Sequence, residues 1–357
     1  LTSLPMVAGA LGIIILSPLL GPVVDRRGAR GMMIVAALLI GVAYLGLTQM
    51  NALWQFIFLF GLAHALHSGV LSGVAGTTAV NNWFIKRRGR AMSFATMGID
   101  IGAVIWLLVA QHIVSTWGWR LLWVGMCILV WVILVIPIGL IMRRRPEDMG
   151  LKPDGLSEEQ TVATVGAHSR QGEVSNLETE TEPAWSAKAA MRTNLFWVIL
   201  VVVALNYLAF GGVWLSLFPH LTDIGISGGL AAGVLSTLQV GILSGRFFWG
   251  FLSERFPVKS IYVLATVSAA LCLILLLSSS SAFPIYVATY LWGLNVGGSV
   301  VLQLTIVGHY FGRRSLGRLQ SFGQMSQALG SATGALLAGL LFDITGTYKG
   351  MFSLLVF

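Results

Sequence analysis

The sequence predicts an all-α integral membrane protein built from two related helix bundles. Three observations lead to this fold class: a composition poor in charge, long stretches without any charged residue, and an internal repeat that relates the two halves. The 357 residues are 56% hydrophobic and only 10% charged, with a mean hydropathy of +0.83. A soluble domain carries about 25% charged residues. The composition therefore excludes a disulfide-stapled secreted domain and a disordered chain, and it argues against a water-soluble enzyme.

The membrane spans follow from where charges are missing. Six stretches contain no Asp, Glu, Lys or Arg: 1–24, 31–85, 121–142, 195–222, 260–312 and 319–342. A helix needs about 20 mostly apolar residues to cross the hydrocarbon core, so the longest stretches must hold two helices each. We expect their turns at 49–52 and 278–283.

Ten complete spans result. In the first half they are expected at 4–24, 32–49, 53–81, 91–115 and 121–142. In the second half they are expected at 195–218, 228–252, 260–279, 284–307 and 320–342, and 351–357 begins one more. Glycine and proline inside these spans are no objection, because neighbouring helices satisfy the freed backbone groups.

The orientation follows from the basic residues in the short loops. One alternating set of loops holds basic clusters at 26–30, 86–90, 143–145, 255–259 and 313–318. The opposite set holds only Arg120 and Lys349. Basic loops stay on the cytoplasmic side, so we expect a multi-pass protein of the cell membrane whose residue 1 lies on the far side.

One long polar segment separates the two groups of spans. Residues 146–194 contain nine acidic and four basic residues and few large apolar ones. Such a composition is typical of a solvated, flexible linker. The chain thus divides into an N-terminal helix bundle (1–145), an acidic cytoplasmic linker (146–194) and a C-terminal helix bundle (195–357).

The two bundles share sequence landmarks at a nearly constant offset. Gly21, Asp25, Arg26 and Arg30 correspond to Gly250, Glu254, Arg255 and Lys259 at an offset of 229 residues, and 89–94 corresponds to 317–322 at an offset of 228. A repeat of this kind indicates a duplicated unit. Shifted back by the same offset, the span at 195–218 falls before residue 1. We therefore expect a fragment of two six-helix halves that lacks the first helix and most of the last.

These motifs resemble a known family. The pattern GxxxDRxGxR at 21–30, its repeat at 250–259 and the segment WFIKRRGRAMSF at 83–94 are similar to the major facilitator superfamily. The segment RRPEDMGLKPDG at 144–155 resembles the monocarboxylate transporter and oxalate–formate antiporter branch. The resemblance implies two pseudo-symmetric six-helix bundles with both termini cytoplasmic, which rock against each other around a central site.

The loop motifs are candidates for a gate on the cytoplasmic side. A carboxylate at a helix end, such as Asp25, can pair with the nearby Arg90 or point at the positive N-terminus of another helix. The alternative is that the bases only fix the topology, which does not require Asp25. The resemblance implies gating roles for Gly21, Asp25, Arg26, Gly28 and Arg30, with Glu254 and Arg255 as counterparts.

Two charged residues, Asp100 and Arg246, lie well inside predicted spans. A charge at the bilayer centre costs roughly 2.5–3.5 kcal/mol, so such residues usually face a cavity or a partner. They lie at similar depths, roughly 15 and 12 Å from the cytoplasmic helix ends at 1.5 Å per residue, so contact between them is possible. The alternative for each is a structural role, as an ion pair, a snorkelling arginine or a cavity-facing acid.

The branch resemblance implies a function for this pair. Arg246 precedes Gly250 by four residues, as an arginine precedes a glycine in the eighth helix of the branch, which implies that Arg246 binds the substrate carboxylate. The mammalian-type pattern has an aspartate where this chain has Ile242, so Asp100 is the candidate proton-accepting partner. Tyr207 and Gln324 are weaker candidates for the lining of the substrate path. The eleventh span contains no lysine, which favours a monoanion over a dianion.

We therefore expect a secondary active transporter of small organic anions, specifically monocarboxylates, that works by alternating access with proton symport or anion exchange. One alternative is a proton-driven exporter of amphipathic compounds, and another is a non-transporting membrane sensor or scaffold. No nucleotide-binding loop, metal cluster or nucleophile–base pair is present, so we expect no enzyme, no cofactor and no metal site. The expected partners are the anion, protons and the lipid bilayer. Nucleic acid is excluded because the basic loops are short and placed to determine topology.

Overall fold

The computed structural model describes residues 4–155, 185–279 and 281–347, and all regular structure in these ranges is helical. The first half consists of α1 (Leu4–Arg27), α2 (Ala29–Thr48), α3 (Leu53–His64) continued by η1 (Ala65–Ala75) and α4 (Gly76–Trp83), α5 (Arg88–Trp117), and α6 (Trp119–Val130) continued by η2 (Trp131–Val135) and α7 (Ile136–Ile141). The second half consists of α9 (Ala187–Ala190), α10 (Asn194–Asp223), α11 (Gly228–Leu252), α12 (Val258–Ser278), α13 (Ala282–Phe311) and α14 (Leu316–Thr345).

The helices confirm the predicted membrane architecture. Nine of them, within the described residues, are long and apolar enough to cross a bilayer, and they coincide with nine of the ten expected spans. The helix α5 occupies the tenth, at 91–115. The expected beginning of a further span at 351–357, and most of the acidic linker, lie outside the described residues.

Local sequence accounts for where the helices begin and end. Gly28 adopts φ = 83°, a left-handed value that favours glycine, and thereby separates α1 from α2. Gly312 does the same with φ = 72° between α13 and α14. The Thr193 hydroxyl accepts a hydrogen bond of 3.4 Å from the backbone N–H of Phe196 and so caps α10.

Two spans contain π-helical segments that hydropathy does not predict. The span beginning at Leu53 widens into a π-helix over Ala65–Ala75 before it continues as α4. The span beginning at Trp119 widens over Trp131–Val135, directly before Pro137. Proline has no N–H and its ring clashes with the carbonyl group four residues earlier, which accounts for the wider turns there.

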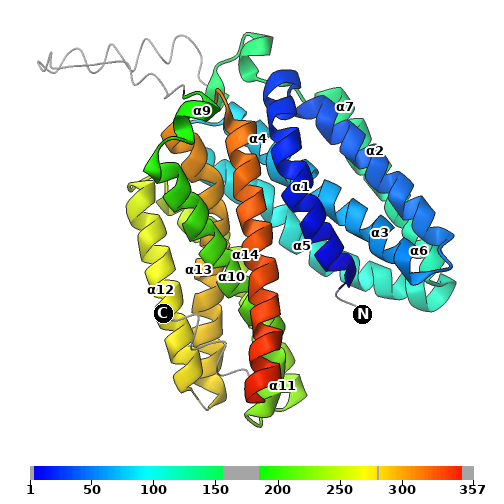
Figure 1. The fold of residues 1–357 in the computed structure, drawn as a ribbon, viewed down its shortest axis with the longest axis vertical. Coiled ribbons are helices and arrows are strands. Elements are labelled where there is room, and N and C mark those ends of the chain that lie inside the picture. The colour runs from blue at the N-terminus through cyan, green and yellow to red at the C-terminus, as the bar shows by residue number, and fades with distance from the viewer. Residues whose placement is uncertain (1–3, 156–184, 280, 348–357) are drawn as a thin grey trace, which may run out of the picture.

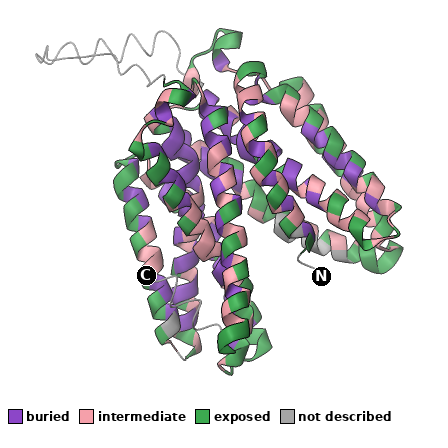
Figure 2. Ribbon diagram, in the orientation of Figure 1, coloured by how far each residue is buried: buried purple, intermediate pink, exposed green. Residues whose placement is uncertain are grey.

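Each half packs as its own bundle (Figure 1). In the second half, α11 crosses α13 at glycines; a Cβ atom at Gly297 would collide with the carbonyl oxygen of Ile242. The helix α13 is the most buried of the spans. In its most apolar stretch 78% of the residues are buried, against 11% for the span Trp119–Ile141. Buried residues accordingly concentrate around α13, whereas the outer helix faces are exposed (Figure 2) and present apolar side chains such as Leu336 and Ile141. This is the distribution expected of a protein surrounded by lipid.

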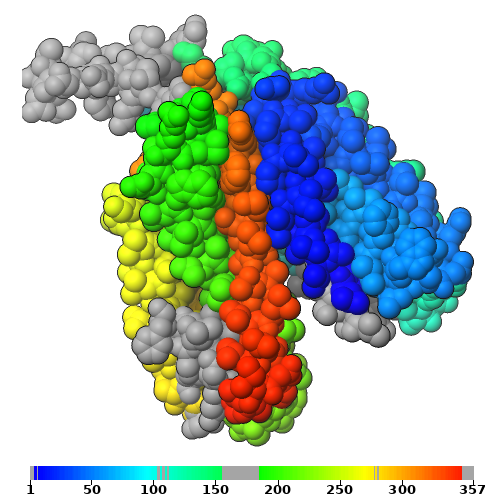
Figure 3. Space-filling model, viewed as in Figure 1, coloured from blue at the N-terminus to red at the C-terminus, as the bar shows by residue number. Residues whose placement is uncertain are grey.

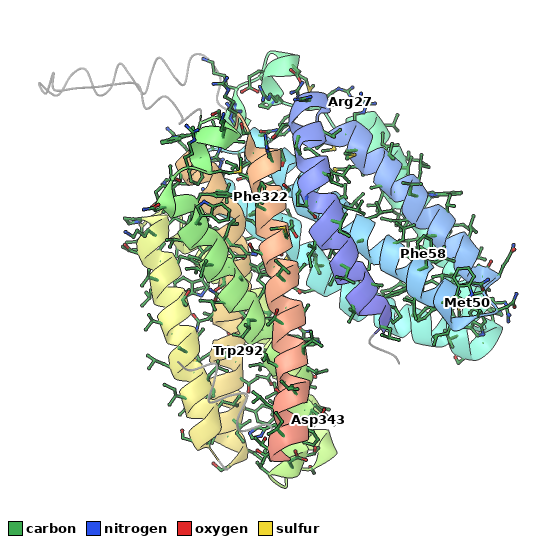
Figure 4. The ribbon with its side chains drawn as sticks, viewed as in Figure 1. Arg27, Met50, Phe58, Trp292, Phe322 and Asp343 are labelled. Carbon is green, nitrogen blue, oxygen red and sulfur yellow. The ribbon has the colours of Figure 1, made fainter. Side chains whose placement is uncertain are left out.

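The two halves meet at one end and separate at the other. In the space-filling view α1 and α14 lie against each other near the C-terminal end of α1, then separate along their length (Figure 3). Arg27 marks this end, and Met50 and Asp343 mark the opposite end, where they lie on separate bundles (Figure 4). Ile13 of α1 and Ala328 of α14 belong to one buried apolar cluster. Contact between the halves is therefore concentrated at the end with the basic loops.

Candidate functional site: a buried ion pair and two helix-end contacts

Arg246 and Asp100, the two charged residues expected inside the membrane, form an ion pair between the halves. Nε of Arg246, on α11, lies 3.0 Å from Oδ2 of Asp100, on α5, and Nη2 donates to Oδ1 at 3.2 Å. The guanidinium thus contacts both carboxylate oxygens, one through a hydrogen bond and the other through the ion pair alone, because Nε and Oδ2 make no hydrogen bond. The side chains are 6% and 17% exposed, so the pair is largely removed from solvent.

Backbone contacts hold this pair in place. Nη1 of Arg246 donates to the carbonyl oxygen of Thr96, one turn before Asp100 on α5. The Ser93 hydroxyl, one turn earlier, donates to the carbonyl oxygen of Arg246 at 2.6 Å. Three consecutive turns of α5 therefore contact one residue of α11. Ser93 and Thr96 could not be singled out from the sequence, because serine and threonine are common in membrane helices and carry no charge.

Tyr207, on α10, bonds to a buried residue of α13. Its hydroxyl accepts a hydrogen bond of 3.1 Å from Nε2 of Gln303. Oε1 of Gln303 is buried without a hydrogen-bond partner. Tyr207 and Gln303 thus form a polar pair contributed by α10 and α13.

Gln324 lies elsewhere on the interface between the halves. It is buried on α14, and its side-chain amide is 3.0 Å from where a Cβ atom on Gly73 of η1 would stand. The contact described for Gln324 is thus with the π-helical segment of the first half. Its predicted place in the substrate path stays a prediction.

The carboxylate of Asp25 caps the N-terminus of α14. Oδ1 accepts a hydrogen bond of 2.7 Å from the backbone N–H of Gly317, and Oδ2 accepts one of 3.0 Å from Arg318. These N–H groups lie in the first turn of α14, where they have no partner within the helix and where the helix dipole is positive. Gly21 permits the approach, since a Cβ atom there would lie 2.7 Å from the carbonyl oxygen of Gly317.

The repeat reproduces this arrangement between the end of α11 and the start of α5. Glu254, the counterpart of Asp25, accepts a hydrogen bond of 3.2 Å from the backbone N–H of Arg90 in the first turn of α5, and pairs with Nε of Arg90 at 2.6 Å. Gly89 and Gly250, the counterparts of Gly317 and Gly21, are in backbone contact; a Cβ atom on Gly250 would lie 3.0 Å from the carbonyl oxygen of Gly89. We call these two contacts the Asp25 latch and the Glu254 latch.

The remaining motif residues support the loop between α1 and α2. Arg30 donates through Nη2 to the carbonyl oxygen of Gly139, and Arg144 donates to the carbonyl oxygen of Asp25 at 2.7 Å while its side chain packs on Gly28. Arg26 and Arg255 are exposed. The structure therefore brings Arg30 and Gly28 to the base of the Asp25 latch, and leaves Arg26 and Arg255 on the surface.

The N-terminal end of the acidic linker is attached to the loops that precede α5 and α14. The sequence did not indicate this attachment. The carboxylate of Asp154 accepts hydrogen bonds of 3.1, 2.9 and 3.2 Å from the backbone N–H groups of Ile85, Lys86 and Arg87, directly before α5. Glu147 pairs with Arg313, in the loop before α14, at 2.9 Å. Residues 146–155 therefore bridge the loops that lead into both latch helices.

The described part of the linker's second end bonds to the second half. The backbone N–H of Trp185 donates to the carbonyl oxygen of Phe311, and that of Ala187 donates to the Ser315 hydroxyl at 3.1 Å. The composition of the linker suggests a flexible segment, but composition cannot predict individual hydrogen bonds such as these two. The expectation of flexibility over the middle of the linker falls outside the described residues.

The described residues contain no group of three His, Cys, Asp or Glu that could hold a metal ion. His64, which shares a helix face with His67 in the sequence pattern, instead packs against Gly9 of α1.

Comparisons with known proteins agree with this architecture. The family model of the major facilitator superfamily matches residues 1–235 and 199–357. An MFS transporter of Aspergillus flavus, asaE, is 24% identical over 95% of this chain and 71% of its own length. Monocarboxylate transporter 12 of Mus musculus is 25% identical over 81% of this chain and 62% of its own, and the riboflavin transporter MCH5 of Saccharomyces cerevisiae is 22% identical over 92% and 61%.

The fold has matches among solved structures. The proton:xylose symporter XylE superposes with a TM-score of 0.74 at 14% identity, covering 99% of this chain and 85% of that one. The human organic anion transporter MFSD10 superposes with a TM-score of 0.69 at 16% identity, covering 99% and 82%. At such identities the likeness shows the fold alone. The family match over nearly the whole chain shows more: this multi-pass membrane protein belongs to the major facilitator superfamily, a family of transporters.

Proposed function

We propose that the protein is a proton-coupled transporter of small organic monoanions, monocarboxylates above all, that works by alternating access. The observation that carries the proposal is the Arg246–Asp100 ion pair, buried between the two halves with both carboxylate oxygens close to one guanidinium group. A site that already holds one carboxylate in this geometry is chemically suited to exchange it for another. The similarity to monocarboxylate transporters 12 and 13 supports the same substrate class.

The Arg246–Asp100 pair offers a direct way to couple the movement of a proton to that of the substrate anion. When a proton binds Asp100, that carboxylic acid no longer neutralises Arg246, and a substrate carboxylate can take its place on the guanidinium. The site then holds one proton and one monoanion more than before, so its net charge is unchanged. Both leave on the other side of the membrane, and Asp100 pairs with Arg246 again. In an exchange-only transporter, by contrast, the anion would displace an ionised Asp100 without any proton.

The latches provide the gate in this proposal. With the basic loops on the cytoplasmic side, as the positive-inside rule expects, the end where the halves meet is cytoplasmic and the structure corresponds to an outward-open state. Opening toward the cytoplasm requires Asp25 to leave the N-terminus of α14 and Glu254 to leave that of α5. The Asp100–Arg246 pair lies between the same helices as the Glu254 latch, so its state and that of the gate are mechanically linked.

Uptake into proteoliposomes that contain the protein tests the proposal. Labelled lactate, pyruvate and formate are offered with an inward proton gradient. We expect accumulation by the wild type, loss of it in Arg246→Ala, and wild-type uptake in Arg192→Ala, which removes an exposed arginine from the linker. Undiminished uptake in Arg246→Ala would contradict the assignment of this residue.

A further inference from the structure

The second half contains a cavity between α10 and α11. Its volume is about 320 Å³, and it is lined by Trp214 of α10 and by Leu235, Ser236 and Gln239 of α11. Trp214 is 46% exposed although it lies within a membrane-spanning helix. The lining thus combines one large aromatic ring with two uncharged hydrogen-bonding side chains.

The helical register connects this cavity to Arg246. Gln239 precedes Arg246 by seven residues on α11, which is two helical turns, so the two side chains project from the same face about 10 Å apart along the axis. Leu235 lies on that face one turn further away. One face of α11 therefore runs from the guanidinium to the cavity.

A row of aromatic rings on α10 leads to the same cavity. The rings of Tyr207 and Phe210 are 6.2 Å apart, and those of Phe210 and Trp214 are 5.5 Å apart. Tyr207 bonds to Gln303, and Trp214 lines the cavity. Ring spacings of 4.5–7 Å are those of interacting aromatic pairs, so the row of rings is continuous from Tyr207 to the cavity.

We propose that the substrates are monocarboxylates with a planar aromatic tail, bound with the carboxylate on Arg246 and the ring in the cavity against Trp214. This inference rests on the proposed function and narrows its substrate class. A two- or three-carbon acid on Arg246 would not reach the cavity, which begins about two helical turns away. The volume lies at the lower end of the range of about 300–1,000 Å³ that is typical of sites for drug-sized ligands. Ser236 and Gln239 supply hydrogen-bonding groups for a polar substituent of the ring.

A matched series of acids tests this inference in proteoliposomes that contain the protein. Acetate, phenylacetate and indole-3-acetate share the carboxylate and differ in the tail, and indole-3-ethanol keeps the ring but lacks the charge. We expect the KM for proton-driven uptake to fall by about tenfold or more from acetate to indole-3-acetate, since ring burial and stacking together contribute more than about 1.4 kcal/mol. Indole-3-ethanol should neither be accumulated nor compete.

Two tryptophan variants on the same helix separate the cavity from general effects on folding. Trp214→Ala should raise the KM for indole-3-acetate about tenfold and leave that for acetate within about twofold, because only the aromatic tail reaches the cavity. Trp197→Ala, which removes a ring 54% exposed on the same helix, should change neither.

The outcomes distinguish this inference from the function on which it rests. Equal KM values for the three acids, with Arg246→Ala still inactive, would overturn the aromatic substrate class and leave monocarboxylate transport standing. An equal effect of Trp214→Ala on acetate and indole-3-acetate would also overturn it. Transport of indole-3-ethanol, or uptake of acids that does not depend on Arg246, would instead contradict the proposed function itself.

Discussion

The carboxylate of Asp25 accepts a hydrogen bond of 2.7 Å from the backbone N–H of Gly317, a residue 292 positions later in the chain. The contact places a negative charge at the positive end of α14 and joins the two halves of the protein. Glu254 makes the equivalent contact with Arg90 at the start of α5. The internal repeat relates Asp25 to Glu254 and Arg318, whose backbone N–H also bonds to Asp25, to Arg90, so the same contact is made twice in the molecule.

Removal of the charge of Asp25 should weaken the closed end of the structure. A carboxylate at a helix N-terminus contributes about 0.3–1 kcal/mol when exposed and up to about 2 kcal/mol when partly buried. Asp25→Asn keeps the size of the side chain and removes its charge, so we expect the inward-open population to rise severalfold. Alkylation of a cysteine introduced at the buried Ser321, beside the latch, measures this change.

Asp223→Asn is the control for that experiment, because Asp223 also ends a membrane helix and is exposed at the opposite end. Its alkylation rate should equal that of the parent. An equal rate in Asp25→Asn would show that the Asp25 latch does not hold the gate.

Glu254→Gln should have an effect of similar size, since the Glu254 latch has the same geometry and adds an ion pair with Arg90. The side chains of that pair are 39% and 14% exposed, so solvent reduces the contribution of the ion pair to about 1 kcal/mol or less. Both latches break in the same opening motion, so we expect the effects of Asp25→Asn and Glu254→Gln on the gating free energy to add in the double variant. The alkylation assay measures all three variants. A double variant no more accessible than either single variant would contradict two separate latches.

Asp154→Ala should destabilise the loop that precedes α5. The carboxylate accepts three backbone hydrogen bonds there. Their loss costs about 1–3 kcal/mol in all, because a hydrogen bond to a charged group contributes about that much and water can replace the carboxylate at the exposed N–H groups of Lys86 and Arg87. We expect a lower unfolding temperature in detergent and faster proteolysis at 84–88. Asp343→Ala removes an exposed carboxylate at the far end of α14 and should leave both measurements unchanged. Unaltered proteolysis in Asp154→Ala would contradict a role for the linker in holding this loop.

Hydropathy and the repeat were sufficient to predict most of this fold. Charge-free stretches located the spans because each must satisfy its backbone within one helix in lipid. The repeat indicated that Asp25 and Glu254 have equivalent positions, and helix rise placed Asp100 and Arg246 at similar depths. Both inferences rest on regular geometry, which a sequence reports directly.

The remaining features depend on single tertiary contacts that no periodic pattern reports. The π-helical turns of η1 leave no trace in hydropathy, because they alter the width of a helix and not its polarity. The contact of Gln324 with Gly73 depends on how α14 crosses η1. The hydrogen bonds of Asp154 join residues about 70 positions apart, within a segment whose composition suggests only solvation.

Proton-driven accumulation by Asp100→Asn tests the central claim most directly. Asparagine resembles the protonated acid, so Arg246 should stay free to bind a carboxylate, but no proton can be carried. We predict that proteoliposomes of this variant lose uphill uptake of labelled monocarboxylate under an inward proton gradient and keep exchange of labelled for unlabelled substrate. Accumulation by Asp100→Asn at the wild-type level would contradict proton coupling through the Asp100–Arg246 pair.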